Sequence, residues 1–280
     1  MSTTLRFDDF TIEGASSAGC ATWFRVRPPG VAFDAGVGPL ALVGTEHLFV
    51  SHGHLDHALG VPFLLSQRSV QHPQSTTKVY CPEASAAPLG DFVAAAERME
   101  RGRYRYSIVP LADGDRVKVG KCYWVEAFST DHVVPTLGFH LIREKTRLRE
   151  DLAELREDEI ADLRRRGERV DEAVEESRLS YCGDTGPELL DRRPSLYEVP
   201  ILMIECTFLG PDLADRSARY RHVHIDDLVS RADRFRNRAL ILYHLSRRHR
   251  RKDFEAAVRE RLPGLADRVL IVDGDDGPRS

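Results

Sequence analysis

The feature that most constrains this chain is a run of seven residues with three histidines and one aspartate. The run reads Ser51-His52-Gly53-His54-Leu55-Asp56-His57. A short apolar segment before it predicts a buried strand, and the apolar stretch Leu59–Leu65 after it predicts a helix. Alternate residues of an extended segment point the same way, so His52 and His54 should face one direction while Asp56 and His57 face another. One loop could therefore serve two neighbouring metal ions.

This pattern resembles the HxHxDH signature of the metallo-β-lactamase superfamily, with His52, His54, Asp56 and His57 at the four positions. The turn Asp34-Ala35-Gly36 after an apolar strand also matches and is expected to support the histidine loop. The resemblance implies an α/β fold in the form of a four-layer α/β/β/α sandwich. The mixture of strands and helices in both halves of the chain agrees with two packed sheets covered by helices.

Apolar runs and turn residues predict the order of the elements along the chain. Strands are predicted at Leu5–Ile12, Thr22–Val26, Val31–Asp34, Lys78–Cys81, Tyr106–Leu111, Arg116–Val119, Cys122–Ser129, Leu179–Cys182, Pro200–Ile204, Ala239–Tyr243 and Val269–Val272. Further helices are predicted at Pro82–Met99, His224–Phe235 and Asp253–Arg261. We expect one domain over residues 1–280, with a frayed tail at Gly274–Ser280. Within it, a charge-dense insert at about 143–178 predicts one or two solvated helices between two strands.

Composition limits the classes of protein and partner. The 42% hydrophobic and 30% charged content is ordinary for a globular protein, and no apolar run reaches the length of a membrane span. No signal peptide is visible at the N-terminus. The five scattered cysteines lack a CxxC pair, which favours reduced thiols and a cytoplasmic location. Because the net charge is −4, binding of a polyanion would require a local basic patch.

Other metal-binding side chains follow predicted strands, where separate segments can converge on one rim of a sheet. Together with the histidine loop they complete a set of imidazoles and carboxylates suited to zinc, with manganese or iron as alternatives. The predicted ligands are His52, His54 and His132 for one ion, Asp56, His57 and His244 for the other, and Asp184 as the bridge. Two such ions can clamp a phosphoryl or carbonyl group, and Asp56 can also act as a general base.

Four segments resemble ribonuclease Z, the endonuclease that trims the 3′ trailers of tRNA precursors. They are Ile204–Phe208 (its E-[SAC]-T-F strand end), Tyr220–Ile225 (its GHxxx segment), Tyr243–Arg248 (its HFSxR segment) and the charged insert, which is similar to that of the short plant-type form. The resemblance implies that His222, or alternatively His224, pairs with Glu205 to protonate the leaving group. It also implies that Ser246, Arg248 and His224 contact the substrate. Ser246 and Arg248 would hold its phosphate, which suits a guanidinium group.

The sequence departs from the ribonuclease Z pattern at three places. Gly14–Cys20 lacks the PxKxRN segment, Leu245 replaces the usual phenylalanine, and Tyr220-Arg221 replaces the glycine before the histidine. The predicted function remains a two-metal (zinc) phosphodiesterase or endoribonuclease that cleaves tRNA precursors 3′ of the discriminator and leaves a 3′-hydroxyl. The alternatives are a hydrolase of a small phosphodiester, thioester or lactone, and a metal-binding module without catalysis.

The resemblance also bears on partners. It implies a homodimer, in which the insert of one subunit reaches substrate held by the other. No membrane partner is expected, because the sequence has no apolar run of 18 residues. The predicted Leu59–Leu65 helix offers Leu64 and Leu65 as a candidate interface, although burial in the core explains these two residues equally well.

Overall fold

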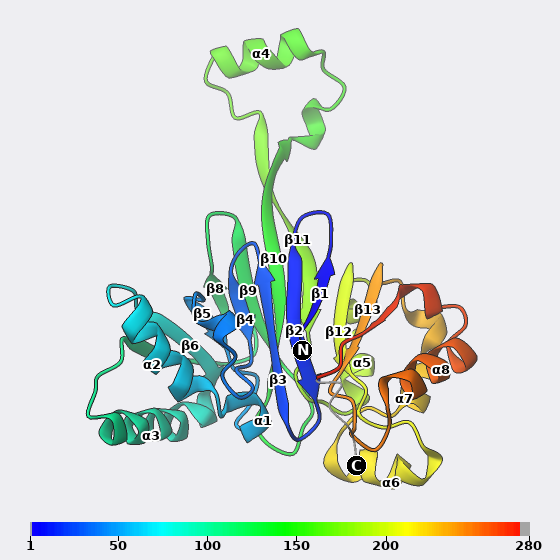
Figure 1. Ribbon diagram of the computed structural model, residues 1–280. Coiled ribbons are helices and arrows are strands. Elements are labelled where there is room, and N and C mark those ends of the chain that lie inside the picture. Colours follow the sequence, from blue (N-terminus) through cyan, green and yellow to red (C-terminus); the bar gives the residue numbers. More distant parts are fainter. Residues whose placement is uncertain (1, 275–280) are drawn as a thin grey trace.

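The structure, a computed structural model, describes residues 2–274 and consists of two facing seven-stranded sheets with helices outside (Figure 1). The first sheet follows the chain: β1 (Thr3–Arg6), β2 (Thr11–Ser17), β3 (Ala21–Arg27), β4 (Val31–Phe33), β5 (His47–Phe49), β6 (Thr77–Pro82) and β7 (Tyr106–Leu111). The second sheet has the reverse order: β14 (Val269–Ile271), β13 (Ala239–Tyr243), β12 (Ile201–Glu205), β11 (Asp171–Tyr181), β10 (Leu137–Leu148), β9 (Tyr123–Ser129) and β8 (Arg116–Lys118).

Helices cover the outer faces of both sheets. On the first sheet lie α1 (Leu55–Ala58), α2 (Val61–Gln71) and α3 (Glu83–Glu100); the second carries α5 (Glu188–Arg192), α7 (Ile225–Val229) and α8 (Arg251–Arg261), with α6 (Ala214–Tyr220) nearby. The four-layer α/β/β/α architecture expected from the sequence is confirmed. No helix within residues 2–274 is both long and apolar enough to cross a bilayer.

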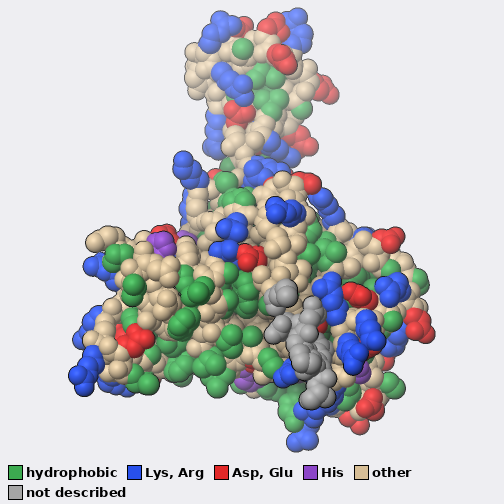
Figure 2. Space-filling view, viewed as in Figure 1, with side chains coloured by type: hydrophobic (Ala, Val, Ile, Leu, Met, Phe, Trp, Pro, Cys, Tyr) green, Lys and Arg blue, Asp and Glu red, His purple; other side chains and the backbone are tan. Residues whose placement is uncertain are grey.

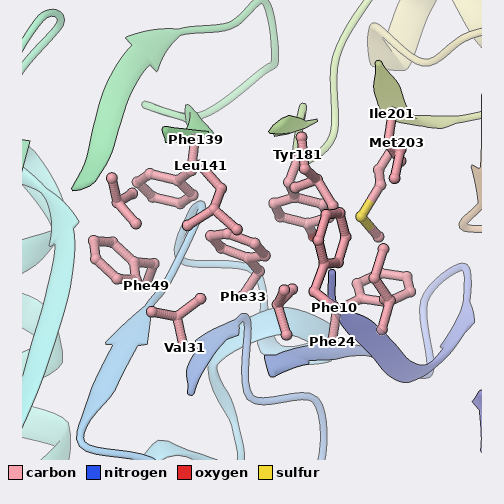
Figure 3. Close-up of a cluster of buried hydrophobic side chains, with 14 of the residues drawn as sticks. Phe10, Phe24, Val31, Phe33, Phe49, Phe139, Leu141, Tyr181, Ile201 and Met203 are labelled. Atoms are coloured by element: carbon pink, nitrogen blue, oxygen red, sulfur yellow. The ribbon is translucent and has the colours of Figure 1, made fainter. Parts of the chain in front are cut away.

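An aromatic core joins the two sheets (Figure 3). Phe33 of β4 stacks on Phe139 of β10 and on Tyr181 of β11, with ring centroids 5.8 Å and 5.2 Å apart. Offset stacks of this kind add to the burial of large apolar surfaces. Because Phe33 belongs to one sheet and its partners to the other, the stacking fixes how the sheets sit against each other.

Strand direction places many loops at the same rim. β4 to β7 pair in parallel, and so do β11 to β14. Because β10 is antiparallel to both β9 and β11, β9 also points the same way as β11. The carboxyl ends of parallel strands open onto one edge, where α/β folds commonly bind ligands. In Figure 1 this edge is the lower end of the molecule, near α1 and α6.

The charged insert is a projecting arm with one α-helix between two strands, and the strands extend further into the predicted range 143–178 than the sequence indicates. β10 extends to Leu148 and β11 starts at Asp171, so the two strands form a long ribbon, and α4 (Glu157–Arg165) lies at its tip. Cross-strand ion pairs such as Lys145–Glu176 (2.6 Å) favour the ribbon over helices. Figure 2 shows acidic and basic side chains interspersed over the arm. The arm rises from the end opposite α1 and α6, so within one chain it points away from that rim.

Other boundaries also differ from the sequence predictions. The single strand predicted at Leu5–Ile12 is interrupted, because β1 ends at Arg6 and β2 starts at Thr11. In the turn between them the Phe7 amide donates to the Phe10 carbonyl around two aspartates. The helix expected at His224–Phe235 ends at Val229, because the side chains of Ser230 and Arg231 donate to the Asp227 carbonyl instead of continuing the helix. The predicted frayed tail lies, for residues 275–280, outside the described part of the chain.

Candidate metal centre and active site

The potential ligands lie at the carboxyl ends of strands from both sheets. His52 and His54 follow β5, Asp56 and His57 lie in α1, His132 follows β9, Asp184 follows β11, Glu205 ends β12 and His244 follows β13. Because these strand ends share one rim, residues far apart in the sequence meet there. Asp34 and His244 adopt left-handed backbone conformations, with φ of 58° and 61°. Strained backbone in non-glycine residues is concentrated at functional sites.

The side chains form two groups whose donor atoms lie within 4.8 Å of one another. The first contains His52, His54, His132 and Asp184, and the second contains Asp56, His57 and His244. Asp184 joins the groups, because its Oδ2 lies 3.8 Å from His52 Nε2 and 3.3 Å from His244 Nε2. Its Oδ1 lies 3.4 Å from His57 Nε2. The structure thus gathers the seven side chains that the sequence predicts as ligands, in the predicted groups.

Asp34 fixes the conformation of the histidine loop through hydrogen bonds. Its buried carboxylate accepts hydrogen bonds from the Ser51 amide (2.6 Å), the Ser51 hydroxyl (2.8 Å), His57 Nδ1 (2.7 Å) and the Tyr181 hydroxyl. The Ser51 hydroxyl also lies 3.0 Å from His52 Nδ1. A carboxylate on the outer nitrogen of an imidazole fixes its tautomer and orientation, as in many metal centres. Asp34 therefore aims the Nε2 atom of His57 at Asp184.

Three buried polar atoms show that the donor set fits metal ions. His52 Nε2, His57 Nε2 and Asp184 Oδ1 have no hydrogen-bond partner within residues 2–274. A buried polar atom without a partner is costly, and a bound cation is one way to satisfy it. All three atoms face the junction between the two groups. Imidazole nitrogens and carboxylate oxygens are suitable ligands for a binuclear centre of zinc or a similar metal.

Comparisons with known proteins agree with this geometry. The profile of the Beta-lactamase superfamily domain matches residues 33–245, which include every proposed ligand. The chain belongs to the metallo-β-lactamase superfamily. It is 27% identical over 271 residues to tRNase Z TRZ1 of Arabidopsis thaliana, covering 96% of both chains. It is 30% identical over 258 residues to a ribonuclease Z of Natronomonas pharaonis, covering 82% of each.

A solved structure shows the same fold. The human tRNase Z, short form, superimposes with a TM-score of 0.61 and 18% identity, covering 94% of this chain and 96% of that one. Within the superfamily this chain is ribonuclease Z-like, as the sequence motifs indicate. With the histidine and aspartate clusters described above, it is a metal-dependent hydrolase.

The charge states of the clusters suit metal binding. Burial lowers the pKa of His52 well below its usual value, and it also lowers the pKa of His54 and His132. Burial alone would raise the pKa of Asp56, but the hydrogen bond with His244 and the nearby imidazoles lower it to about 2. Neutral imidazoles and ionised carboxylates are the forms that bind metal ions.

His57 behaves differently because two carboxylates face it. Burial opposes its protonation, but the charges of Asp184 and Asp34 raise the pKa of His57 well above its usual value. The proton on His57 balances negative charge that would otherwise be buried without compensation. Since a metal ligand must be deprotonated, an ion bound at this group would compete with that proton.

A second network lies beside the metal ligands and is centred on Glu205, which is fully buried. Glu205 Oε1 lies 2.6 Å from His222 Nδ1, and Glu205 Oε2 accepts a 2.6 Å hydrogen bond from the Thr207 hydroxyl. Thr207 Oγ1 in turn lies 3.0 Å from His244 Nδ1. Burial opposes protonation of His222, yet the charge and hydrogen bond of Glu205 raise its pKa to about 9. Glu205 therefore orients His222 directly and His244 through Thr207.

His224 does not share this environment. Its Nε2 lies 2.9 Å from the Gly210 carbonyl, and its Nδ1 accepts from the Asp226 amide at the start of α7. With both ring nitrogens engaged by backbone groups, His224 caps this helix. We therefore correct the expectation that His224 contacts substrate or acts as the alternative proton donor: Glu205 contacts His222 instead.

A cleft of about 490 Å³ opens onto the metal-binding groups. It is lined by Asp56, Asp184, His222 and His244, and also by Ser246 and Arg248, the predicted phosphate contacts. The strand end that carries His244 continues directly into these two residues. The structure therefore brings the predicted phosphate contacts to the same opening as the predicted ligands.

Sequence reasoning missed several supporting groups. Ser51 and Thr207 lie within two residues of His52 and Glu205, but their role depends on contacts across the fold. Gly19, in the turn after β2, donates its amide to Asp56 Oδ2 (2.9 Å). The only available signal was proximity to a motif, which cannot show which side chain a hydroxyl or amide reaches.

Loss of one imidazole should reduce metal loading. After removal of metal with a chelator and reconstitution with zinc, the wild type should bind about two ions per chain, and His54→Ala should lose about one. Elemental analysis by mass spectrometry measures this directly. His72→Ala provides the matched control, because His72 is an exposed histidine that follows α2. Equal zinc content in His54→Ala and the control would contradict the ligand assignment.

Proposed function

We propose that this protein is a two-metal phosphodiesterase that acts as an endoribonuclease on tRNA precursors, cleaving 3′ of the discriminator to leave a 3′-hydroxyl. The observation that carries the proposal is the contact between the buried Glu205 and the partly buried His222, at the same cleft as the two ligand groups. A metal-assisted hydrolase of a thioester has less need for such a proton donor than a phosphodiesterase with a poor alkoxide leaving group. The names of the sequence relatives, tRNase Z and ribonuclease Z, support the choice of substrate.

Zinc is the proposed ion at both positions, with manganese or iron as alternatives. The ligands would be His52, His54 and His132 for one ion, Asp56, His57 and His244 for the other, and Asp184 between them. When bound, two divalent ions would polarise the phosphoryl oxygens and lower the pKa of a water molecule.

The protein's own residues would perform the remaining steps. Asp56 is held by the Gly19 amide at the cleft, where its carboxylate can accept a proton from the attacking water. His222 has Nδ1 on Glu205, which leaves Nε2 to donate a proton to the leaving 3′ oxygen. Ser246 and Arg248 would hold a phosphate, since a guanidinium group forms strong hydrogen bonds to its oxygens.

One experiment separates the candidate functions. Purified protein is incubated with Zn²⁺ or Mn²⁺ and either a tRNA precursor or bis-p-nitrophenyl phosphate. We expect cleavage of the precursor at the discriminator. Added salt should weaken this cleavage, and the effect of salt should be smaller in Arg248→Ala. Cleavage of the dye ester alone would replace the proposal with a small-molecule phosphodiesterase. Metal binding without cleavage of either compound would favour a thioester or lactone hydrolase or a binding module.

We further propose a single domain over residues 1–280, a homodimer and a cytoplasmic location. The core shared by both sheets supports the single domain, and five free cysteines suit a reducing compartment. The predicted interface residues Leu64 and Leu65 are buried in the core, so they cannot form it. Leu55, Leu59 and Phe63, which are 62%, 44% and 45% exposed, offer an apolar surface instead.

The apolar surface of α1 and α2 gives the dimer a direct test. Wild-type protein should sediment as a dimer, and Phe63→Glu should shift it toward monomer because a buried charge at an interface is costly. Val70→Glu is the control, since Val70 is also apolar and is 77% exposed near the far end of α2. A wild-type monomer at micromolar concentration in analytical ultracentrifugation would refute the dimer.

A further inference from the structure

We propose that Tyr220, together with the guanidinium group of Arg216, forms a stacking site for an unpaired nucleobase next to the scissile phosphate. This inference deepens the proposed function and rests on it. Tyr220 occupies a position where the sequence departs from the ribonuclease Z pattern, and none of the catalytic steps above requires it. Its placement, its neighbours and the charge around it each point to a ligand with a flat aromatic face.

Tyr220 and Arg216 lie on the wall of the catalytic cleft. Both come from α6 and line the same opening as Asp56, Asp184 and His222. Tyr220 is 39% exposed, so a large part of the side chain is open to solvent instead of packed in the core. Residues that line a cleft and keep an aromatic surface exposed are available to a ligand.

The end of α6 is tied to the catalytic groups, which fixes the position of Tyr220. The next residue, Arg221, has a left-handed backbone with φ of 53° and ends the helix. Its carbonyl lies 3.2 Å from His132 Nδ1, and its Nη1 donates to Asp131 Oδ1 (2.9 Å). A base stacked on Tyr220 would therefore stand at a constant position relative to a proposed metal ligand.

A second hydrogen bond connects α6 to the proposed proton donor. Ser217, the buried residue of α6, donates its hydroxyl to the carbonyl of His222. The helix that carries Tyr220 is thus anchored to His132 on one side and to His222 on the other. Pre-organisation of this kind lowers the entropy cost of binding.

Two arginines of α6 lie over the Tyr220 ring. The guanidinium carbons of Arg216 and Arg219 are 5.1 Å and 5.6 Å from its centroid. Within residues 2–274 neither arginine forms an ion pair, whereas arm arginines such as Arg147 pair with acids. Unpaired guanidinium groups stacked on an aromatic ring attract the phosphates of RNA and stack on its bases. This local positive charge occurs on a chain with a net charge of −4.

The test compares Tyr220→Ala and Tyr220→Phe on a tRNA precursor and on two versions that lack one base, either 5′ or 3′ of the cleavage site. Tyr220→Ala should raise KM for the intact RNA by about 10-fold or more, with a much smaller change in kcat, because one stacked base is lost. Tyr220→Phe keeps the ring and should stay within about twofold of the wild type. On one of the two abasic RNAs, wild type and Tyr220→Ala should have the same KM.

The outcomes separate this inference from the proposed function. If the wild type cleaves the precursor but Tyr220→Ala has an unchanged KM, the stacking site is refuted and the proposed function stands. A KM increase in Tyr220→Ala that persists on both abasic RNAs also refutes it, because the effect then does not depend on a base. If the wild type cleaves no RNA, the proposed function fails. Fluorescence anisotropy with labelled intact and abasic strands then decides: equal affinities for wild type and Tyr220→Ala refute base stacking.

Discussion

Replacing Asp56 with asparagine should lower turnover of a phosphodiester by about 10³-fold while the protein remains folded. The substitution keeps the size of the side chain and an oxygen that can accept from the Gly19 amide. It removes the negative charge next to His244 Nε2, 3.3 Å away, and with it a proposed ligand and general base. The measurement is the kcat for bis-p-nitrophenyl phosphate at saturating metal, with circular dichroism to check the fold.

Asp8→Asn is the matched control for this prediction. Asp8 is an exposed aspartate that pairs with Arg238 on the surface, and it lies outside the cleft. Its replacement should leave turnover within about twofold, because exposed ion pairs contribute little. If Asp56→Asn retained more than a tenth of wild-type turnover, Asp56 would be neither an essential ligand nor the base.

Glu205→Gln and His222→Ala should each reduce turnover of the RNA substrate by about 10²- to 10⁴-fold, the usual contribution of a general acid. Without the carboxylate, His222 loses the charge that keeps it protonated and the 2.6 Å contact that orients it. The double variant should be about as slow as the slower single variant, because the effects of substituting residues that act as one unit do not add.

Metal content distinguishes a proton donor from a ligand. His222 also lies close to Asp184 and His244. The donor atoms of these three residues lie within 4.8 Å of one another and form a third group. As a proton donor, His222 can be replaced without loss of zinc, so His222→Ala should match the wild type and the His72→Ala control in elemental analysis. Zinc loss in His222→Ala would reassign it as a ligand, and additive effects in the double variant would separate it from Glu205.

The candidate site was largely predictable because its ligands are marked by local patterns. Three histidines and an aspartate within seven residues rarely have another explanation, and His132, Asp184 and His244 each follow an apolar strand. Parallel strands carry their carboxyl ends to one rim, so a correct list of strands already implies convergence. The structure of the arm was harder to predict from the sequence, because charged residues such as Lys145 and Glu176 suit exposed helices and exposed ribbons equally. Only the pairing of the two strands favours the ribbon.

The sequence by itself determined the superfamily, the four layers and the two groups of potential ligands, because these depend on residue type and on spacing along the chain. Only the tertiary structure favours His222 over His224 as the proposed proton donor. The two stand two residues apart, but the rim turns His222 toward Glu205, while the start of α7 occupies both ring nitrogens of His224. The proposed role of Tyr220 likewise depends on the residues that line the cleft with it, which the sequence does not show. The physical reason is that orientation depends on hydrogen bonds between distant segments, and spacing along one strand or helix does not encode them.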